Sequence, residues 1–331
     1  MPSKLKLSIG YQLPDLRRIA DVVEDFAEDI DEVYFPWQGV ANGRGVSIAN
    51  ADEQKIMERE LTDIHARGVR LNMLWNANCY GGKSISCELE RGVGDAISGM
   101  QKRIGIEAIT TASLFVASCV KRLFPNIEVR ASVNMGIGSV TAMKCVQDYF
   151  DSFYIRRDLN RFPEKIFSLR EWSAANGKRI YLLANSGCLQ ECPAHVFHDN
   201  LVSHEEEIAR EDSPWCGFKG VCWDYYSNTR NHPSFLADST WIRPEEIESY
   251  CDLVDGIKLA TRTHRDPELV VSSYARRSFS GNTLSLCEPD FSSLCHLDNS
   301  KFSVSGLERF GSLPDAARQK FCKEEFKNVR C

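Results

Sequence analysis

Short apolar segments recur eight times along the chain, and helical patterns separate them. Such an alternation predicts parallel strands joined by crossover helices. Eight strands favour a closed (β/α)8 barrel of the TIM-like type, which commonly takes about 250 residues. The alternative is an open doubly wound sheet, but the glycine-rich phosphate fingerprint of that fold is absent from the sequence. The predicted strands cover residues 5–10, 32–36, 70–76, 106–111, 127–134, 152–157, 179–185 and 256–262.

Two segments depart from a regular barrel. The connection between residues 185 and 243 carries Cys, His and aromatic side chains and little helical pattern. Long irregular connections are usually functional or disordered, and the cysteines and aromatics here favour order. The tail contains no further strand–helix unit. We therefore expect residues 1–278 to form the barrel and residues 279–331 to form a C-terminal extension packed on it. Helices are predicted between the strands at residues 15–26, 51–66, 139–149 and 159–175.

The overall charge and the distribution of apolar residues exclude several classes of protein. The formal net charge of −6 argues against general nucleic-acid binding, which needs a basic surface. The N-terminus has no apolar signal-peptide core, and no apolar run approaches the length of a membrane span. We expect a cytoplasmic protein with no nucleic-acid partner and no membrane span.

Thirteen cysteines are many for a chain of this class, and their odd number argues against a disulfide framework. Cys119 and Cys145 lie on apolar helical patterns, which predicts that both are buried core thiols. The remaining cysteines concentrate after residue 187, where a different role is indicated.

Four cysteines are predicted to meet at one end of the barrel. Cys188 and Cys192 follow the strand predicted at 179–185, and Cys79 follows the strand predicted at 70–76. Parallel strands deliver their C-terminal residues to the same face. Cys222 completes the set, with Cys216 as its substitute. Scattered thiolates of this kind favour a 4Fe-4S cluster over zinc, although buried or incidental thiols remain an alternative.

Histidines and basic residues supply further candidates. His198 and His204 are predicted to donate protons near the cluster, or one of them to replace a cysteine ligand, with loop capping as the structural alternative; His195 is less favoured. Lys258 and Arg262 lie on one side of the last strand, where they would bind a carboxylate or phosphate. The alternative is an ion pair with Asp158 or Glu107, and Arg157 is equally ambiguous. The candidate catalytic residues are His198, His204, Lys258 and Arg262.

Aromatic residues follow two of the predicted strands. They would form a pocket wall, or else pack beneath the long connection. The residues are Trp75, Trp215, Trp223, Tyr225 and Tyr226.

Four motifs, in this order, resemble those of the collagenase-like peptidase family U32, which includes UbiU/UbiV-like iron–sulfur proteins. The similarity extends over roughly residues 5–280. The motifs occupy residues 154–161, 182–193, 241–250 and 255–262.

The resemblance implies a barrel-like fold, a 4Fe-4S cluster and oxygen-independent hydroxylation. Cys188, Cys192 and Cys222 match family cysteines, and Lys258 and Arg262 match a Lys-x-x-x-Arg strand. Cys79 has no matching ligand, and the acidic residue of the usual Lys-Ile-Glu-Gly-Arg motif is lost in Lys-Leu-Ala-Thr-Arg.

Three functions remain open. The first is an iron–sulfur-dependent enzyme that carries out hydroxylation or related redox chemistry on a small or carrier-bound substrate. The second is a peptidase, although no Ser-His-Asp set or His-Glu-x-x-His helix is present. The third is a non-catalytic metal-bearing accessory protein in a biosynthetic complex, with a protein partner of the same family.

Overall fold

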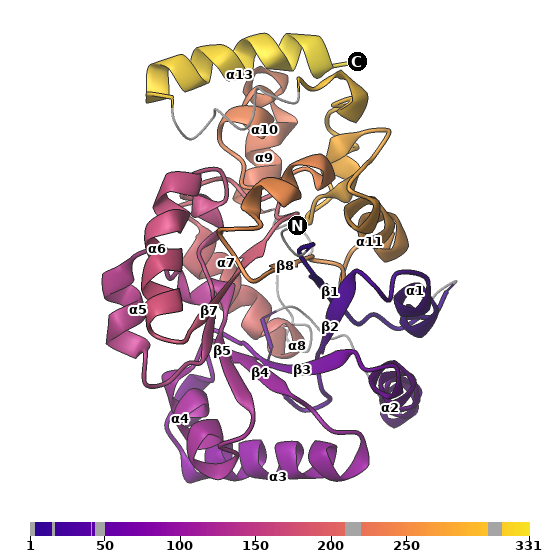
Figure 1. Cartoon of the computed structure of the whole chain (residues 1–331), viewed down its shortest axis with the longest axis vertical. Helices are drawn as coiled ribbons and strands as arrows, with labels where there is room; N and C mark the ends of the chain where they lie inside the picture. Colours follow the sequence, from indigo (N-terminus) through magenta and orange to yellow (C-terminus); the bar gives the residue numbers. More distant parts are fainter. Residues whose placement is uncertain (1–3, 15–16, 41, 44–49, 209–219, 304–312) are drawn as a thin grey trace.

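Eight parallel strands form a closed barrel in sequential order, which confirms the predicted (β/α)8 class (Figure 1). The computed structural model describes residues 4–14, 17–40, 42–43, 50–208, 220–303 and 313–331. Pairing of Leu7 with Ile257 and of Ser8 with Lys258 closes the barrel. The strands are β1 (Leu7–Gly10), β2 (Ile30–Phe35), β3 (Arg70–Trp75), β4 (Ala108–Thr111), β5 (Glu128–Ala131), β6 (Ser152–Tyr154), β7 (Arg179–Leu183) and β8 (Gly256–Lys258).

Helices cover the outside of the barrel, and their ends follow local capping rules. The side chain of Asn50 accepts from the backbone N–H groups of Asp52 and Glu53, and Ser86 and Ser113 cap the next two helices in the same way. The outer helices are α1 (Ile19–Asp25), α2 (Ala51–Ala66), α3 (Cys87–Arg103), α4 (Leu114–Leu123), α5 (Val140–Val146), α6 (Pro163–Ala175) and α11 (Pro267–Arg276).

Only one of the two thiols predicted to lie in the core is buried. Cys119 is buried on α4, as predicted, among apolar residues of the main core. Cys145 is exposed, so its prediction was wrong. The short helix α5 buries Met143, and Cys145 is two residues farther along the helix, which places it on another face.

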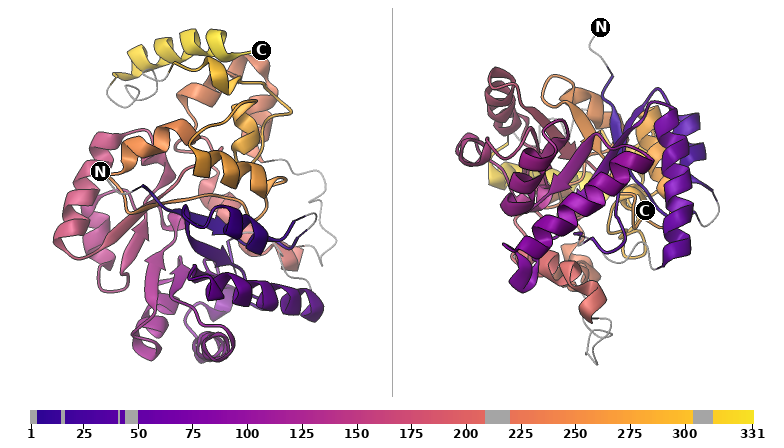
Figure 2. Two further views of the ribbon diagram at one scale, coloured as in Figure 1. Left: turned by 45° about the vertical axis from the view of Figure 1, so that its right-hand side comes forward. Right: turned by 90° about the horizontal axis from the view of Figure 1, so that it is seen from below.

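The long connection after β7 contains more helix than its sequence predicts. It forms α7 (His195–Ser203), α8 (Glu205–Ile208), α9 (Val221–Ser227) and α10 (Ser234–Ala237). Helix α10 packs against α13 (Asp315–Val329), and Figures 1 and 2 show these helices stacked at the end of the molecule away from α3. The predicted boundary at residue 278 stays a prediction.

A second hydrophobic core joins this connection to the C-terminal tail. Tyr226 stacks on Phe235 with ring centroids 3.8 Å apart, and Trp223 lies 4.8 Å from Phe291. Tyr226 and Trp223 therefore pack in this core, which agrees with the alternative prediction that they pack beneath the long connection. Tyr225, in contrast, is 38% exposed. Trp215 lies outside the described residues.

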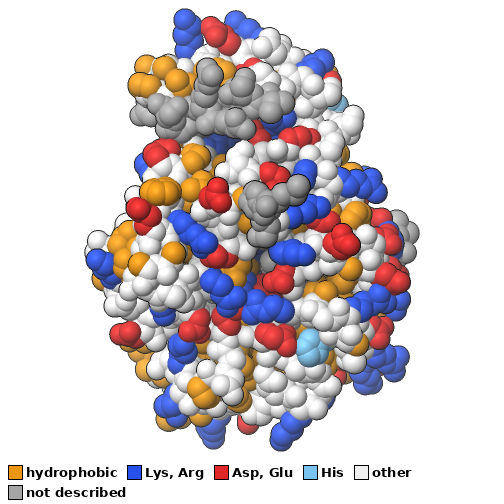
Figure 3. Space-filling model, in the orientation of Figure 1, with side chains coloured by type: hydrophobic (Ala, Val, Ile, Leu, Met, Phe, Trp, Pro, Cys, Tyr) orange, Lys and Arg blue, Asp and Glu red, His pale blue; other side chains and the backbone are white. Residues whose placement is uncertain are grey.

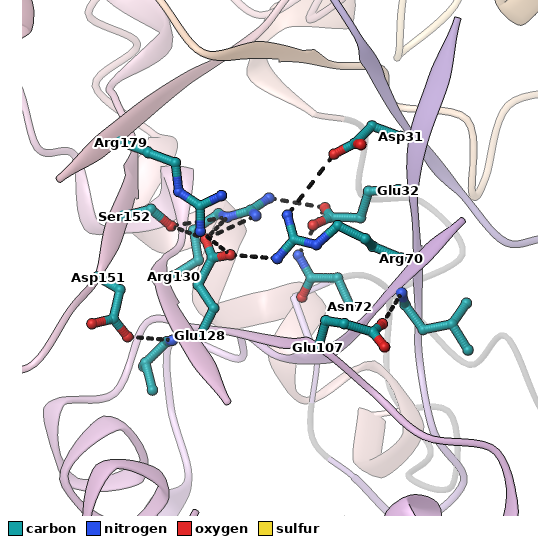
Figure 4. Close-up of polar contacts among 12 residues, drawn as sticks. Asp31, Glu32, Arg70, Asn72, Glu107, Glu128, Arg130, Asp151, Ser152 and Arg179 are labelled. Atoms are coloured by element: carbon teal, nitrogen blue, oxygen red, sulfur yellow. Dashed lines mark hydrogen bonds and ion pairs between the residues drawn. The ribbon is translucent and has the colours of Figure 1, made fainter. Parts of the chain in front are cut away.

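Charged side chains fill the interior of the barrel at the N-terminal half of the strands, where branched apolar residues are common in this fold. Arg130 lies 2.8 Å from Glu32 and 3.0 Å from Glu128, and all three are buried (Figure 4). Arg70 of β3 and Arg179 of β7 also reach Glu128, each from two strands away in the barrel. Burial opposes the ionisation of Glu128, but the surrounding arginines outweigh it and lower its pKa to about 2.

The surface mixes both signs of charge. Figure 3 shows Lys and Arg side chains interspersed with Asp and Glu on the face in view. Within the described ranges, no helix is both long enough and apolar enough to span a bilayer.

Candidate active site

A cavity of about 80 Å³ opens at the C-terminal end of the barrel. Several of its polar side chains belong to residues that follow the strands, the position at which barrels of this type hold their active sites. Asn76 follows β3, Asn134 follows β5, Arg157 follows β6, and Cys188 follows β7. Residues that are far apart in the sequence thus line one small cavity.

The backbone around Cys188 is held by its neighbours. The Asn185 amide donates to the carbonyls of Ala260 and Leu286 and accepts from the Ala260 N–H at 2.6 Å. This side chain therefore ties the end of β7 to the segment after β8 and to the tail. A Cβ atom on Gly187 would lie 2.9 Å from the Pro289 carbonyl, so only glycine allows this close approach.

A guanidinium lies beside the Cys188 thiol. Arg157 Nη1 donates to Cys188 Sγ at 3.1 Å, and Arg157 Nη2 lies 2.7 Å from His195 Nε2. Arginine has no acceptor, so the imidazole Nε2 accepts this bond and His195 is neutral at that nitrogen. Burial and Arg157 lower the pKa of His195, against the opposing charge of Asp199 at 3.1 Å. Arg157 thus separates the thiol from the imidazole.

Lys258 occupies the floor of the same cavity. Its side chain is buried, and Nζ lies 4.0 Å and 4.7 Å from the ring centroids of Tyr34 and Tyr154. The rings favour the ammonium form by about 0.5–2 kcal/mol. Burial has the larger opposite effect and, with the charges of Arg262, Arg130 and Arg157, lowers the pKa of Lys258 to about 7 despite Glu32.

Arg262 lines the cavity together with Lys258, as their predicted placement on one side requires. The ion pairs considered as alternatives are made by other residues. Asp158 lies 2.9 Å from Arg156, and Glu107 lies 2.8 Å from His65. Arg262 Nη1 instead donates to the Asn42 side chain at 2.8 Å.

The four cysteines that were predicted to meet do not all line the same cavity. Cys222 is partly buried, and burial together with the charges of nearby Cys188 and Cys192 raises its pKa to about 11. Cys79 instead lines a separate cavity of about 560 Å³ with Ser203 and His204. Cys216 lies outside the described residues. Within the described ranges, no three His, Cys, Asp or Glu side chains are arranged as a metal site.

The histidines are also divided between the two cavities. His198 lines the cavity of Cys188, whereas His204 lines that of Cys79. His195, the least favoured from sequence, makes the direct contact with Arg157. Sequence reasoning missed Asp199; the only available signal was its position four residues after His195, which places both on one helix face.

Comparisons with known proteins support the resemblance to peptidase family U32. The chain is 23% identical to the uncharacterized protease MJ1657 of Methanocaldococcus jannaschii over 96% of its length and 94% of that protein. The structure of the U32 peptidase Mk0906 superposes with a TM-score of 0.57 at 15% identity, covering 78% of this chain and 93% of the other. This structural likeness shows the shared fold. No protein-family model matches the chain.

Proposed function

We propose that this chain is an enzyme that uses the thiolate of Cys188 on an anionic substrate bound at the C-terminal end of the barrel. The main support for this proposal is the 3.1 Å contact between Arg157 and Cys188, because a neighbouring cation stabilises a thiolate. Lys258 and Arg262 join Arg157 as basic groups of the cavity, which has two acidic side chains, Asp199 and Glu288. An anion therefore suits the site better than a cation.

Peptide hydrolysis is the first candidate reaction, and the names of the two similar proteins favour it. Cys188 would attack the peptide carbonyl and form a thioester, while His198 gives a proton to the departing amine. His195 would then accept a proton from the water that cleaves the thioester. Arg157 must shift for this step, because it caps His195 Nε2.

An iron–sulfur cluster is the second candidate, and the electrostatic influence of Cys188 and Cys192 on Cys222 supports it. The charges of Cys188 and Cys192 both act on Cys222, and thiolates are the usual ligands of such clusters. These three residues would hold the group, with the fourth ligand open between Cys79 and Cys216. The cluster would supply electron transfer or oxygen-independent hydroxylation. Arg157 beside Cys188 suits the net negative charge of a thiolate-bound cluster.

One preparation can separate these candidates. The full chain is purified without oxygen, iron and sulfide are measured, and hydrolysis of a mixture of unstructured peptides is followed by mass spectrometry. Cleavage that disappears in Cys188→Ser, with no iron bound, supports the peptidase. Iron and sulfide that disappear in Cys192→Ser support the cluster. Cleavage that persists in Cys188→Ser, in a protein without iron, would overturn the proposed role of the thiolate. Cys145→Ser, on the exposed side of α5, is the matched control.

A further inference from the structure

We propose that Lys258 is a covalent binding site for a small oxo acid. Its amine would form an imine with the carbonyl carbon of the ligand, while the arginines of the same cavity hold the carboxylate. The inference rests on the proposed function only in taking this cavity as the substrate site. It applies whichever reaction Cys188 performs.

The position of the amine is unusual for a lysine. Lys258 is 7% exposed, lines the cavity, and presents Nζ to the faces of Tyr34 and Tyr154. Within the described ranges, Lys258 forms no ion pair with a carboxylate. The buried acid whose charge acts on Lys258, Glu32, accepts hydrogen bonds from Ser8, Asn72 and Arg130 instead. Figure 4 shows Glu32 beside Asn72 and Arg130.

A lysine in these surroundings can act as a nucleophile. Only the neutral amine attacks a carbonyl, and an ordinary lysine is almost fully protonated near pH 7. Burial lowers the pKa of Lys258 to about 7, so about half of the side chains carry the free amine at that pH. Arg130 also lies near the Tyr154 ring, with its guanidinium 5.2 Å from the ring centroid, and its charge further lowers the pKa of Lys258.

The cavity limits the size and the charge of the ligand. A buried water needs about 10–15 Å³ of such space, so 80 Å³ accommodates a molecule of about six non-hydrogen atoms. Glyoxylate and its methyl homologue have this size. Arg157 and Arg262 line the cavity together with Lys258, and arginine is the side chain best suited to a carboxylate.

The covalent step is balanced without an oxidant or a reductant. The amine of Lys258 adds to the carbonyl carbon and forms a C–N bond. The carbonyl oxygen takes up the two amine protons and leaves as water, which yields the imine. Hydrolysis reverses each step and returns the free lysine.

Reductive trapping tests this inference directly. The full chain is incubated with glyoxylate and sodium cyanoborohydride, and the modified lysine is located by peptide mass mapping. We expect one mass increase, equal to the acid less one oxygen atom, at Lys258, with an initial rate about a hundredfold above that of exposed lysines. Lys178 is the matched control, because its pKa is also lowered by burial but its Nζ contacts the carbonyls of Gln147 and Phe150 at the other end of the barrel.

Two further variants keep the result interpretable. Arg262→Gln should slow trapping of glyoxylate but not of acetaldehyde, which has no carboxylate. Trapping should persist in Cys188→Ser, so failure of the thiolate proposal is distinguishable from failure of this one. An unmodified Lys258, or equal labelling of Lys178 and Lys258 in the folded protein, would overturn the inference. Lys258→Arg and Lys258→Met, checked for folding by circular dichroism, should both abolish the product.

Discussion

Arg157 and Cys188 lie 3.1 Å apart, and this contact joins the turn after β6 to the loop after β7. The two residues are separated by 31 positions in the chain. A buried guanidinium next to a thiol stabilises the thiolate, the form that acts as a nucleophile and as a metal ligand. The contact is therefore relevant to both candidate reactions, and removing the Arg157 guanidinium should change the reactivity of Cys188.

Replacing Arg157 by methionine should slow the alkylation of Cys188 by iodoacetamide about tenfold, because the thiolate loses its nearby cation. The rate is measured by mass spectrometry of the peptide that contains Cys188. Arg156→Met is the control, since Arg156 pairs with Asp158 instead. An unchanged rate in the Arg157 variant would show that the contact does not activate the thiol.

Loss of a cluster ligand should remove iron. If Cys188, Cys192 and Cys222 hold a cluster, Cys192→Ala and Cys222→Ala lose iron and sulfide and become less soluble, because a bound metal group also stabilises the folded state. Elemental analysis after anaerobic purification measures this loss. Cys119→Ala, in the α4 core, should retain the iron of the parent protein. Full iron retention in the Cys192 variant would contradict the ligand set.

Breaking the buried charge network should destabilise the barrel. Glu128→Gln leaves Arg130 without one of its two carboxylates, and we expect a loss of about 3–5 kcal/mol in the free energy of unfolding, measured with urea. Glu88→Gln is the control, because its pair with Lys83 is exposed to solvent and should contribute little to the free energy of unfolding. Equal effects of the two substitutions would contradict a structural role for the network.

Glu128 should also make the stability of the folded protein depend on pH. The folded-state pKa of Glu128 is about 2, below its ordinary value of 4.5. The stability it contributes is therefore fully present above pH 4.5 and is lost as the pH falls through 2. Acid unfolding of the parent protein should be steeper in this range than that of Glu128→Gln. Parallel acid-unfolding curves would refute this assignment.

Lys258 should lower the stability of the fold at neutral pH, because burial disfavours its charged form, whereas the charged form of Glu128 is favoured. Its pKa falls from 10.5 in the unfolded chain to about 7 in the fold, so the unfolded state binds more protons between these values. Stability should rise as the pH rises from 7 to 10.5. Lys258→Met should therefore be more stable than the parent at pH 7, by up to about 5 kcal/mol, and the advantage should shrink by pH 10. A difference independent of pH would exclude a neutral amine.

Much of the fold could be predicted because strand and helix periods are local properties of the sequence. All eight strands lie where their apolar segments predict them. Their ends are less well predicted: the strand expected at 256–262 stops at Lys258. The Asn185 side chain binds the N–H and carbonyl of Ala260 and so takes the place of a neighbouring strand. No local pattern at residues 259–262 records this distant partner.

The sequence by itself determined the barrel, and with it the meeting of Cys188, Lys258 and Arg262 at one end, because parallel strands present their C-terminal residues together. Only the tertiary structure decided which side chains touch. It placed Arg157 between Cys188 and His195, and it directed Cys79 into a different cavity. The path of a loop and the rotation of a helix depend on packing between residues far apart in the chain, and that packing has no signature in local periodicity.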